Sequence, residues 1–459
     1  AMSGTVAGLV LVSCDDPSGR NSPNEQDTRP AAKWLGLPVV EPGNFQEAKD
    51  MTKWLFDLSE EIKSICMLRC VSKISHTRGN VRLGELPKKE LKAHYDLSRI
   101  PRLPNPAGHA ALLRRLEKTR EIFETSPFNW YVGPDSPELL IITCGACWLY
   151  SREAVKILNL ENRVGILKLG TLWPLPEKLV ARYLVKAPKV LFFEEIDPFL
   201  EESVMELAAA LLPTSPRPIF YGKHSGHITA YGEQDPNIII RALVKIMDVP
   251  YQFRGGEYDK QAEEIAQKYV IMRSGTLCPG CPHKATFWVI KNALRLDGRY
   301  GFVAGDIGCY TAGLGPGGFS VVKTIYCMGA GAGVANGFGQ LGRFGFTQPV
   351  IAACGDSTFY HAAIPALING VYNNANFILA VFDNSATAMT GFQPHPGTGV
   401  TAMGEPAPVV SIEALCRAMG IRTEICDPFD IKNATATLLD LMAMDSGPRV
   451  IIMRRECEL

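Results

Sequence analysis

The sequence predicts an α/β protein made of three doubly wound units with mainly parallel sheets. Short apolar runs of strand length recur along the chain, and helix-like amphipathic segments separate them. Spacings of roughly twenty to thirty residues between these runs fit parallel strands joined by crossovers. A chain of 459 residues is also long enough for about three domains of ordinary size, each with its own core.

The first unit is expected over residues 1–96. Strand-like and helix-like runs alternate there, at residues 8–13, 44–63 and 65–69. Residues 6–14 end in a lipobox-like Leu11-Val-Ser-Cys14, but no basic segment precedes them and Asp15-Asp16-Pro17 follows. A signal peptide would not have these flanks, so we interpret the segment as a core strand.

Residues 97–133 are expected to form a linker and a surface helix. Prolines interrupt residues 100–106 and prevent a regular helix or central strand, whereas residues 108–124 are amphipathic. A second α/β unit is expected over residues 134–250, with strands at 139–143, 164–168 and 190–194. The third unit is expected over residues 251–459, with strands at 302–304, 324–326, 350–353, 377–382 and 449–453.

Composition excludes several functional classes. Lys+Arg and Asp+Glu are equal at 47 each, so nothing attracts this chain to nucleic acid or to an anionic membrane surface. The apolar runs are of strand length, so no segment is expected to span a bilayer. Thirteen cysteines without a targeting segment indicate a reducing compartment, and we expect a cytoplasmic location.

A carboxylate and an amide follow two successive apolar runs of the third unit. Residues 350–354 lead into Gly355-Asp356-Ser357, and residues 377–382 lead into Asn384. A helix-like segment at residues 361–372 lies between them, so the two carboxyl ends should meet at one edge of a parallel sheet, where such sheets bind ligands. Gly-Asp-Ser alone is common in turns, but its pairing with Asn384 makes it a candidate site.

These residue types fit thiamine diphosphate bound through Mg²⁺. The ion prefers an octahedron of oxygens and rarely takes all of them from protein. We expect Asp356, Asn384 and the backbone carbonyl of Ala386 to supply the protein's share, with diphosphate oxygens as further ligands. Ser357 and Thr358 open the helix-like segment, whose free N–H groups and positive dipole end would face the diphosphate.

Several segments of the third unit share their sequence with a known family. They are Cys278-Pro-Gly-Cys281-Pro-His283, Gly305-Asp-Ile-Gly-Cys309-Tyr310, residues 327–334, residues 383–391 and Gln393-Pro-His395-Pro-Gly397. Further segments upstream follow one another in the order that is usual for the same family. They are Asp15-Asp16-Pro17 with residues 24–27, residues 75–79 and residues 167–176. Together they closely resemble the thiamine-diphosphate large subunit of the indolepyruvate:ferredoxin oxidoreductases, over nearly the whole chain.

The resemblance implies a thiamine-diphosphate-binding fold. Residues 1–96 would be part of a pyrimidine-binding-type domain, residues 134–250 a domain similar to the transketolase C-terminal domain, and residues 251–459 the diphosphate-binding domain. The family also has a pyrimidine-contacting glutamate upstream of the matched region and a C-terminal ferredoxin-like domain. We therefore expect either that the chain is a fragment or that other polypeptides supply these parts.

Four cysteines of the third unit are candidate metal ligands. Cys278 and Cys281 form a C-x2-C pair, Cys309 follows 28 residues after Cys281, and Cys457 lies after the last expected strand. By spacing alone the pair suits Zn²⁺ as well as iron–sulfur. Related 2-oxoacid:ferredoxin oxidoreductases hold a 4Fe–4S cluster with this pattern, so the resemblance implies the same ligands here. Zinc could not perform the one-electron steps of that family.

Two glycines and two further residues complete the expected cofactor site. Gly329 and Gly331 belong to a glycine-rich run that would let the backbone approach the thiazolium and the diphosphate. Glycine-rich turns of this kind are unspecific by themselves. The resemblance adds Thr390 and Gly391 as cofactor-binding residues.

Other polar and sulfur-containing residues leave alternatives open. His283 and His395 are candidate acid–base groups that face the substrate, or else satisfied structural residues. Cys144-Gly-Ala-Cys147 repeats the C-x2-C spacing without a companion pair, so we interpret it as structural. We expect Glu194-Glu195 to be a solvated or interface carboxylate pair.

The resemblance implies oxidative decarboxylation of an arylpyruvate, similar to indolepyruvate, to the acyl-CoA. Electrons would leave through the 4Fe–4S cluster to ferredoxin, and a smaller γ-type subunit would be a partner. Two alternatives remain at this point. A non-oxidative thiamine decarboxylase or carboligase would need no cluster, and a non-catalytic partner subunit would lack the pyrimidine-side glutamate.

Overall fold

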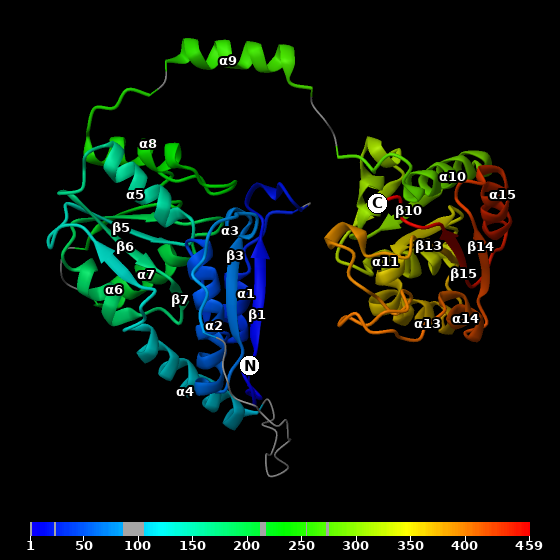
Figure 1. The fold of residues 1–459 in the computed structure, drawn as a ribbon, viewed down its shortest axis with the longest axis horizontal. Coiled ribbons are helices and arrows are strands. Elements are labelled where there is room, and N and C mark those ends of the chain that lie inside the picture. The colour runs from blue at the N-terminus through cyan, green and yellow to red at the C-terminus, as the bar shows by residue number, and fades with distance from the viewer. Residues whose placement is uncertain (1, 23, 86–104, 212–216, 254, 272–274) are drawn as a thin grey trace. The chain divides into compact units, whose positions relative to one another are not determined.

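The computed structural model describes residues 2–22, 24–85, 105–211, 217–253, 255–271 and 275–459 (Figure 1). The chain divides into two compact units, Ala1–Gly256 and Glu257–Leu459. Three sheets are present among the described residues, two in the first unit and one in the second. The predicted α/β class with mainly parallel sheets is confirmed.

The first sheet of the first unit has the strand order β1-β3-β2-β7. Strands β1 (Val10–Asp15), β3 (Cys66–Val71) and β2 (Val39–Val40) are parallel, and β7 (Thr171–Trp173) pairs antiparallel with β2. Its helices are α1 (Arg29–Leu35), α2 (Phe45–Ile62), α3 (Ser72–Ser75) and α4 (Pro106–Phe123). The helices expected at residues 44–63 and 108–124 are present as α2 and α4. Of the proline-rich segment 100–106, residues 100–104 lie outside the described residues.

The second sheet of this unit has the order β4-β6-β5-β8-β9. The strands are β4 (Trp130–Val132), β5 (Leu139–Cys144), β6 (Val164–Leu169), β8 (Lys189–Phe193) and β9 (Ile219–Tyr221), all parallel except β4. The accompanying helices are α5 (Cys147–Ile157), α6 (Glu177–Leu184), α7 (Phe199–Leu211) and α8 (Pro236–Met247). One buried cluster contains Val39 and Met67 of the first sheet with Leu140 and Phe192 of the second, so the two sheets share a core.

Two sequence-based expectations for this unit are wrong. Strand β1 is at the edge of its sheet, and Leu11 and Val12 are exposed, so residues 6–14 do not contain a core strand. Glu194 and Glu195 are both buried, and Glu194 forms an ion pair with Arg29 at 2.7 Å. Burial of the Glu194 charge depends on this arginine, which lies 165 residues away in the sequence.

The second unit contains one fully parallel sheet of order β11-β10-β12-β13-β15-β14. Its strands are β10 (Phe302–Gly305), β11 (Val322–Ile325), β12 (Val350–Gly355), β13 (Phe377–Asp383), β14 (Arg422–Cys426) and β15 (Pro448–Arg454). Its helices include α9 (Gly256–Tyr269), α10 (Pro282–Asp297), α11 (Ala330–Gly339), α13 (Ile364–Tyr372), α14 (Ile412–Ala418) and α15 (Ile431–Met442). Every strand expected for this unit is present, and β14 was not predicted.

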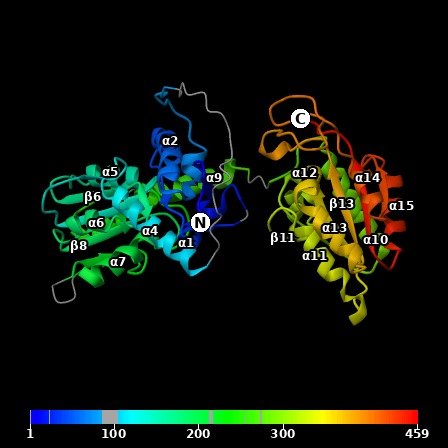
Figure 2. The ribbon, with the colours of Figure 1, turned by 90° about the horizontal axis from the view of Figure 1, so that it is seen from below.

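Helices cover both faces of this sheet (Figure 2). One buried cluster joins α10 and α15 to one face through Phe287, Leu438 and Ile451. A second cluster joins α11 and α13 to the other face through Ala335, Leu367 and Val381. This doubly wound arrangement leaves the carboxyl edge of the strands free for polar groups. None of the described helices has both the length and the apolar character needed to cross a membrane.

Candidate active site

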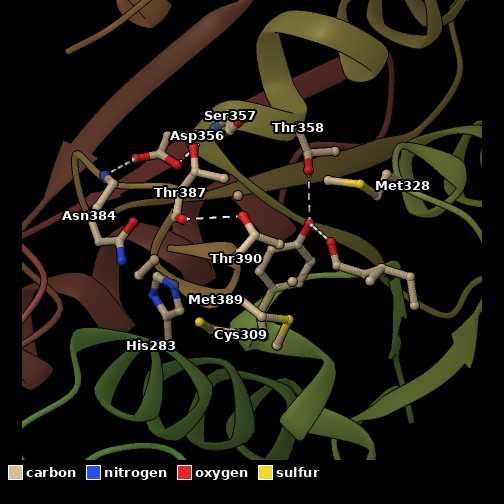
Figure 3. Close-up of a pocket in the computed structure, with 16 residues that line it drawn as sticks. His283, Cys309, Met328, Asp356, Ser357, Thr358, Asn384, Thr387, Met389 and Thr390 are labelled. Carbon is tan, nitrogen blue, oxygen red and sulfur yellow. Dashed lines mark hydrogen bonds between the residues drawn. The ribbon is translucent and has the colours of Figure 1, made fainter. Parts of the chain in front are cut away.

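A small pocket lies at the carboxyl edge of β12 and β13 in the second unit. The parallel register pairs Gly355 with Phe382, so the residues that follow each strand, Asp356 and Asn384, come together as the sequence predicts. The cavity measures about 100 Å³. Its walls include most of the predicted cofactor residues: His283, Gly355, Asp356, Ser357, Thr358, Asn384, Ala386 and Thr390 (Figure 3).

Asp356 is held in one orientation by backbone donors. It is 2% exposed, its Oδ1 accepts the Ser357 N–H at 2.7 Å, and its Oδ2 accepts the Ala386 N–H at 3.2 Å. Asn384 is also buried and lines the same cavity. One carboxylate and one amide oxygen beside a cavity are hard ligands of the kind that Mg²⁺ takes from protein. The donor set therefore fits a bound magnesium ion.

His395 is next to this carboxylate. Its Nδ1 accepts the Gly397 N–H at 3.1 Å, so the ring proton of the neutral imidazole is on Nε2. Nε2 lies 3.4 Å from Asp356 Oδ2, and the ring stacks on Tyr360. His395 does not line the pocket, and its contact is to the predicted metal ligand.

His283 has a different environment, although it also borders the pocket. It is 4% exposed and packs edge-on against the Phe382 ring at 5.2 Å between ring centroids. Burial lowers the pKa of its imidazole to about 4, although the Asp356 charge acts in the opposite direction. His283 is therefore neutral near pH 7, so one of its ring nitrogens can donate a hydrogen bond and the other can accept one.

The helix that begins at Asp356 is irregular. A short α-helical turn, α12 (Asp356–Thr358), continues into a π-helical turn at Phe359–Ala363 and then into α13. Pro365 has no N–H for the usual backbone bond, which accounts for the break in the regular ladder. Such π-helical turns are frequent at functional sites, and this one directly follows the pocket residue Thr358.

The glycine-rich run is placed differently from our expectation. Gly329 and Gly331 do not line the pocket; their N–H groups donate to Asp306 instead, that of Gly329 at 2.9 Å. Gly391, at φ +115°, needs the freedom of glycine and follows Thr390 at the exposed mouth of the cavity. From this part of the chain, Met328 reaches the pocket wall.

The four candidate cysteines line one larger cavity beside this pocket. Its volume is about 670 Å³, and Cys278, Cys281, Cys309 and Cys457 all contribute to its walls. Burial and the neighbouring thiols raise the pKa of Cys309, so the sulfurs lie within electrostatic range of one another. Among the described residues no three such side chains converge as ligands of a single ion.

Backbone donors near Cys281 partly oppose the burial that raises the pKa of its thiol. The Cys281 N–H donates to the Cys278 carbonyl at 3.2 Å, and Gly280 closes this turn at φ +77°. Cys281 caps α10, where the backbone N–H groups of His283 and Lys284 lower the pKa of its thiol against the larger effect of burial. A helix N-terminus stabilises negative charge on sulfur. Cys144 and Cys147, by contrast, are fully buried in the first unit.

The two cavities share part of their walls. His283, Cys309, Asn384, Ala388 and Met389 border both of them. In addition, the Cys457 N–H donates to the Asn384 carbonyl at 3.0 Å, so the segment after β15 is fixed to a residue of the pocket. The predicted cofactor and cluster residues are therefore adjacent in the fold.

Some residues at the pocket were not predicted from the sequence. They are Tyr310, Met328, Thr387 and Met389 on the walls, with Asp306 behind them. Asp306 could have been found, because it follows an apolar strand directly, as Asp356 does. The other side chains lie in family-like segments of the sequence, at residues 305–310, 327–334 and 383–391, but no role was predicted for them.

Comparison with known proteins identifies a cofactor-binding domain in the second unit. Residues 306–453 match the family described as thiamine pyrophosphate enzyme, C-terminal TPP binding domain. Among solved structures, a 2-oxoglutarate:ferredoxin oxidoreductase from Magnetococcus marinus is 18% identical, with a TM-score of 0.34, over 42% of this chain and 67% of that chain.

Curated relatives match almost the full chain. Indolepyruvate oxidoreductase subunit IorA of Pyrococcus horikoshii is 38% identical over 99% of this chain and 72% of its own length. The subunit of the same name from Archaeoglobus fulgidus is 38% identical over 100% of this chain and 72% of its own length. With this identity and coverage, and with a thiamine pyrophosphate-binding domain in its second unit, the chain belongs to the family of indolepyruvate oxidoreductase subunit IorA.

Proposed function

We propose that this chain is the thiamine-diphosphate subunit of an enzyme that oxidatively decarboxylates an arylpyruvate to its acyl-CoA. Electrons would leave through a 4Fe–4S cluster held by Cys278, Cys281, Cys309 and Cys457 toward ferredoxin. The observation that carries this proposal is the common wall between the pocket at Asp356 and the cavity of the four thiols. Electron transfer between neighbouring groups requires such proximity.

The residues of the pocket fit the binding of the cofactor. Asp356, Asn384 and the Ala386 carbonyl would hold Mg²⁺, and Ser357 and Thr358 would face the diphosphate. Thiamine diphosphate, when bound, supplies the carbon nucleophile that attacks the ketone and accepts the electron pair released with CO₂. The protein orients the substrate and excludes water.

The two histidines would have separate roles. His283, which is neutral and borders both cavities, would donate a hydrogen bond from its one N–H to the substrate carboxylate or carbonyl oxygen. His395 would hold Asp356 toward the metal through its Nε2 proton. We therefore assign His395 a positioning role.

We favour a cluster over a zinc ion, because the proposed reaction needs a one-electron carrier and zinc does not change its oxidation state. In a 4Fe–4S cube each thiolate binds a different iron, so the four sulfurs surround a volume. The cavity of about 670 Å³ leaves room for an inorganic cube between them.

Metal analysis tests this assignment. Protein purified without oxygen should contain about four irons and four sulfides per chain, and its visible absorption should bleach with dithionite. Cys309→Ala should lose the cluster, whereas Cys144→Ala, a buried cysteine of the other unit, should keep it. In the complete complex, Cys309→Ala should still release CO₂ from the 2-oxo acid but fail to reduce ferredoxin. Zinc in place of iron, or a cluster that survives loss of Cys309 and Cys457 together, would indicate a non-redox thiamine enzyme.

The relatives' name supports an aromatic 2-oxo acid such as indolepyruvate as the substrate and a complex of several subunits. We further propose coenzyme A as acyl acceptor, a smaller γ-type subunit and a cytoplasmic location, which rest on the family resemblance and on the cysteine content of the sequence. Assays of the complex with indolepyruvate, phenylpyruvate, pyruvate and 2-oxoglutarate test the substrate. A clear preference for pyruvate would refute the aromatic assignment.

A further inference from the structure

Asp306 is a buried carboxylate behind the wall of the pocket. It follows β10 directly, and its side chain is 0% exposed. Its Oδ2 accepts the Gly329 N–H at 2.9 Å, and the Gly331 N–H also donates to this carboxylate. Its Oδ1 accepts the Tyr310 hydroxyl. The N-terminal turn of α11 therefore already has an anion from within the protein, and these N–H groups are not available to a phosphate.

Tyr310 connects this carboxylate to the pocket. Its ring lines the cavity, and its hydroxyl oxygen lies 3.2 Å from Thr358 Oγ1 and 3.0 Å from the Ile307 carbonyl oxygen (Figure 3). Thr358 is 2% exposed and also lines the cavity. Asp306, Tyr310 and Thr358 thus form a chain of hydrogen bonds that ends at the pocket.

The proton on Asp306 determines the direction of this chain. A tyrosine or threonine hydroxyl has one proton to donate. When Asp306 is ionised, it accepts a charge-assisted hydrogen bond from the Tyr310 hydroxyl. Thr358 can then bond to Tyr310 only by donating its own hydroxyl proton to the Tyr310 oxygen. When Asp306 is protonated, it donates to Tyr310, whose proton turns to Ile307 or Thr358. The Thr358 hydroxyl is then free to donate into the pocket.

We propose that Asp306 is a positioning residue whose proton makes Thr358 a donor to the anionic group bound in this pocket. This inference rests on the proposed function, in which that group is the diphosphate of thiamine diphosphate. Cofactor binding should therefore take up a proton from solvent onto Asp306. An ionised Asp306 leaves only oxygen lone pairs of Thr358 facing the diphosphate, which is unfavourable.

The electrostatics of the buried groups support this coupling. Burial raises the pKa of Asp306 to about 6, so its proton is exchanged near neutral pH. The titratable groups that act with it among the described residues are Tyr310 and Cys354. Burial raises the pKa of both well above their ordinary values, so both stay neutral. An anion in the pocket raises the pKa of Asp306 further, because like charges repel.

Calorimetric titration of the full chain with thiamine diphosphate and Mg²⁺ tests the proposal. Asp306→Asn places an amide donor against Tyr310 and so imitates the protonated acid. We expect the ratio of wild-type to variant affinity to fall as pH rises above about 6, by at most about tenfold per unit. The ratio cancels the ionisation of the cofactor itself and of Asp356, which both proteins share.

Proton uptake provides a second measurement, from the dependence of the binding enthalpy on the buffer. The wild type should take up part of a proton near neutral pH, and Asp306→Asn should take up less. Tyr310→Phe interrupts the chain but keeps Asp306, so it should lose the part of the pH dependence that passes through Thr358 and keep only the part due to direct charge repulsion. This variant tests the proposal if Asp306→Asn does not fold, and a pH dependence equal to that of the wild type would then overturn it. Asp440→Asn, on the exposed side of α15, should behave as the wild type.

The possible outcomes separate this inference from the proposed function. Cofactor binding with the same pH dependence in the wild type, Asp306→Asn and Tyr310→Phe would overturn the inference and leave the cofactor assignment intact. No binding by the wild type at any pH would refute the cofactor assignment, and the inference with it.

Discussion

Replacement of Glu195 by glutamine should stabilise the first compact unit at alkaline pH but not at acid pH. The side chain is 1% exposed, and its Oε2 accepts the Gln234 N–H at 3.0 Å. Its Oε1 has no hydrogen-bond partner among the described residues. Burial raises the pKa of the carboxyl to about 7, against the smaller effects of that hydrogen bond and of Arg69 and Lys73.

The size of the expected stability gain follows from the shift in the pKa of Glu195. The ordinary pKa is 4.5 and the folded value is about 7, a rise that corresponds to about 3 kcal/mol. Because the folded pKa is raised, the stability is fully present below the unfolded pKa and is lost as pH rises through about 7. Glutamine keeps an acceptor for Gln234 and cannot ionise. Glu195→Gln should therefore gain about 3 kcal/mol well above pH 7 and almost nothing below pH 4.5.

Urea unfolding at acid and alkaline pH measures this difference. Tryptophan fluorescence is a suitable signal, because all but one of the six tryptophans lie in the first unit: Trp34, Trp54, Trp130, Trp148 and Trp173. Glu206→Gln, an exposed change on α7, is the matched control and should show no pH-dependent gain. A gain of equal size at both pH values, or a loss at alkaline pH, would refute the argument.

Three further predictions concern the second unit. Asp356→Ala should abolish Mg²⁺-dependent binding of thiamine diphosphate without unfolding the protein. Asn384→Ala should weaken this binding less, because the lost ligand is neutral. Unchanged affinity of Asp356→Ala in calorimetry would contradict the metal assignment. The 3.4 Å contact of His395 Nε2 with Asp356 Oδ2 does not have hydrogen-bond geometry. His395→Leu should therefore raise the Mg²⁺ concentration for half-maximal cofactor binding only about fivefold, less than the loss of a full hydrogen bond to a charged group would cause, and His395→Gln should restore most of it. Equal losses in both variants would argue against the role of Nε2. Phe382→Ala removes a fully buried ring between His283 and Phe287. This change should cost about 3–5 kcal/mol of stability, seen as a lower melting temperature. A loss below about 1 kcal/mol would contradict this packing.

Local sequence patterns were sufficient to predict most of the longer strands and the place where Asp356 and Asn384 come together. Apolar runs of strand length predict strands wherever both faces of a sheet are covered, as for β12 and β13. The carboxyl ends of neighbouring parallel strands lie at one edge, so the placement of Asp356 and Asn384 follows from their positions in the sequence. The domain divisions at residues 96, 133 and 250 stay predictions. Short strands such as β2 and β7 have too few residues for a visible pattern.

The burial of charged groups was decided by tertiary structure alone. Glu194 is buried because Arg29 from a distant segment pairs with it, and no local pattern announces that pairing. The exposure of β1 likewise depends on its place at the edge of the sheet, which an apolar sequence does not specify.

The sequence by itself determined which chemical groups are available, and the fold determined which of them act together. The residue types at Asp356 and Asn384 predict a metal-bound diphosphate, and the four cysteines predict a metal centre. Only the tertiary structure shows that the two cavities share a wall and that Asp306 takes the N–H groups of the glycine-rich run. The physical reason is that hydrogen bonds and electrostatic forces depend on distance in space, which chain topology sets and residue order alone does not.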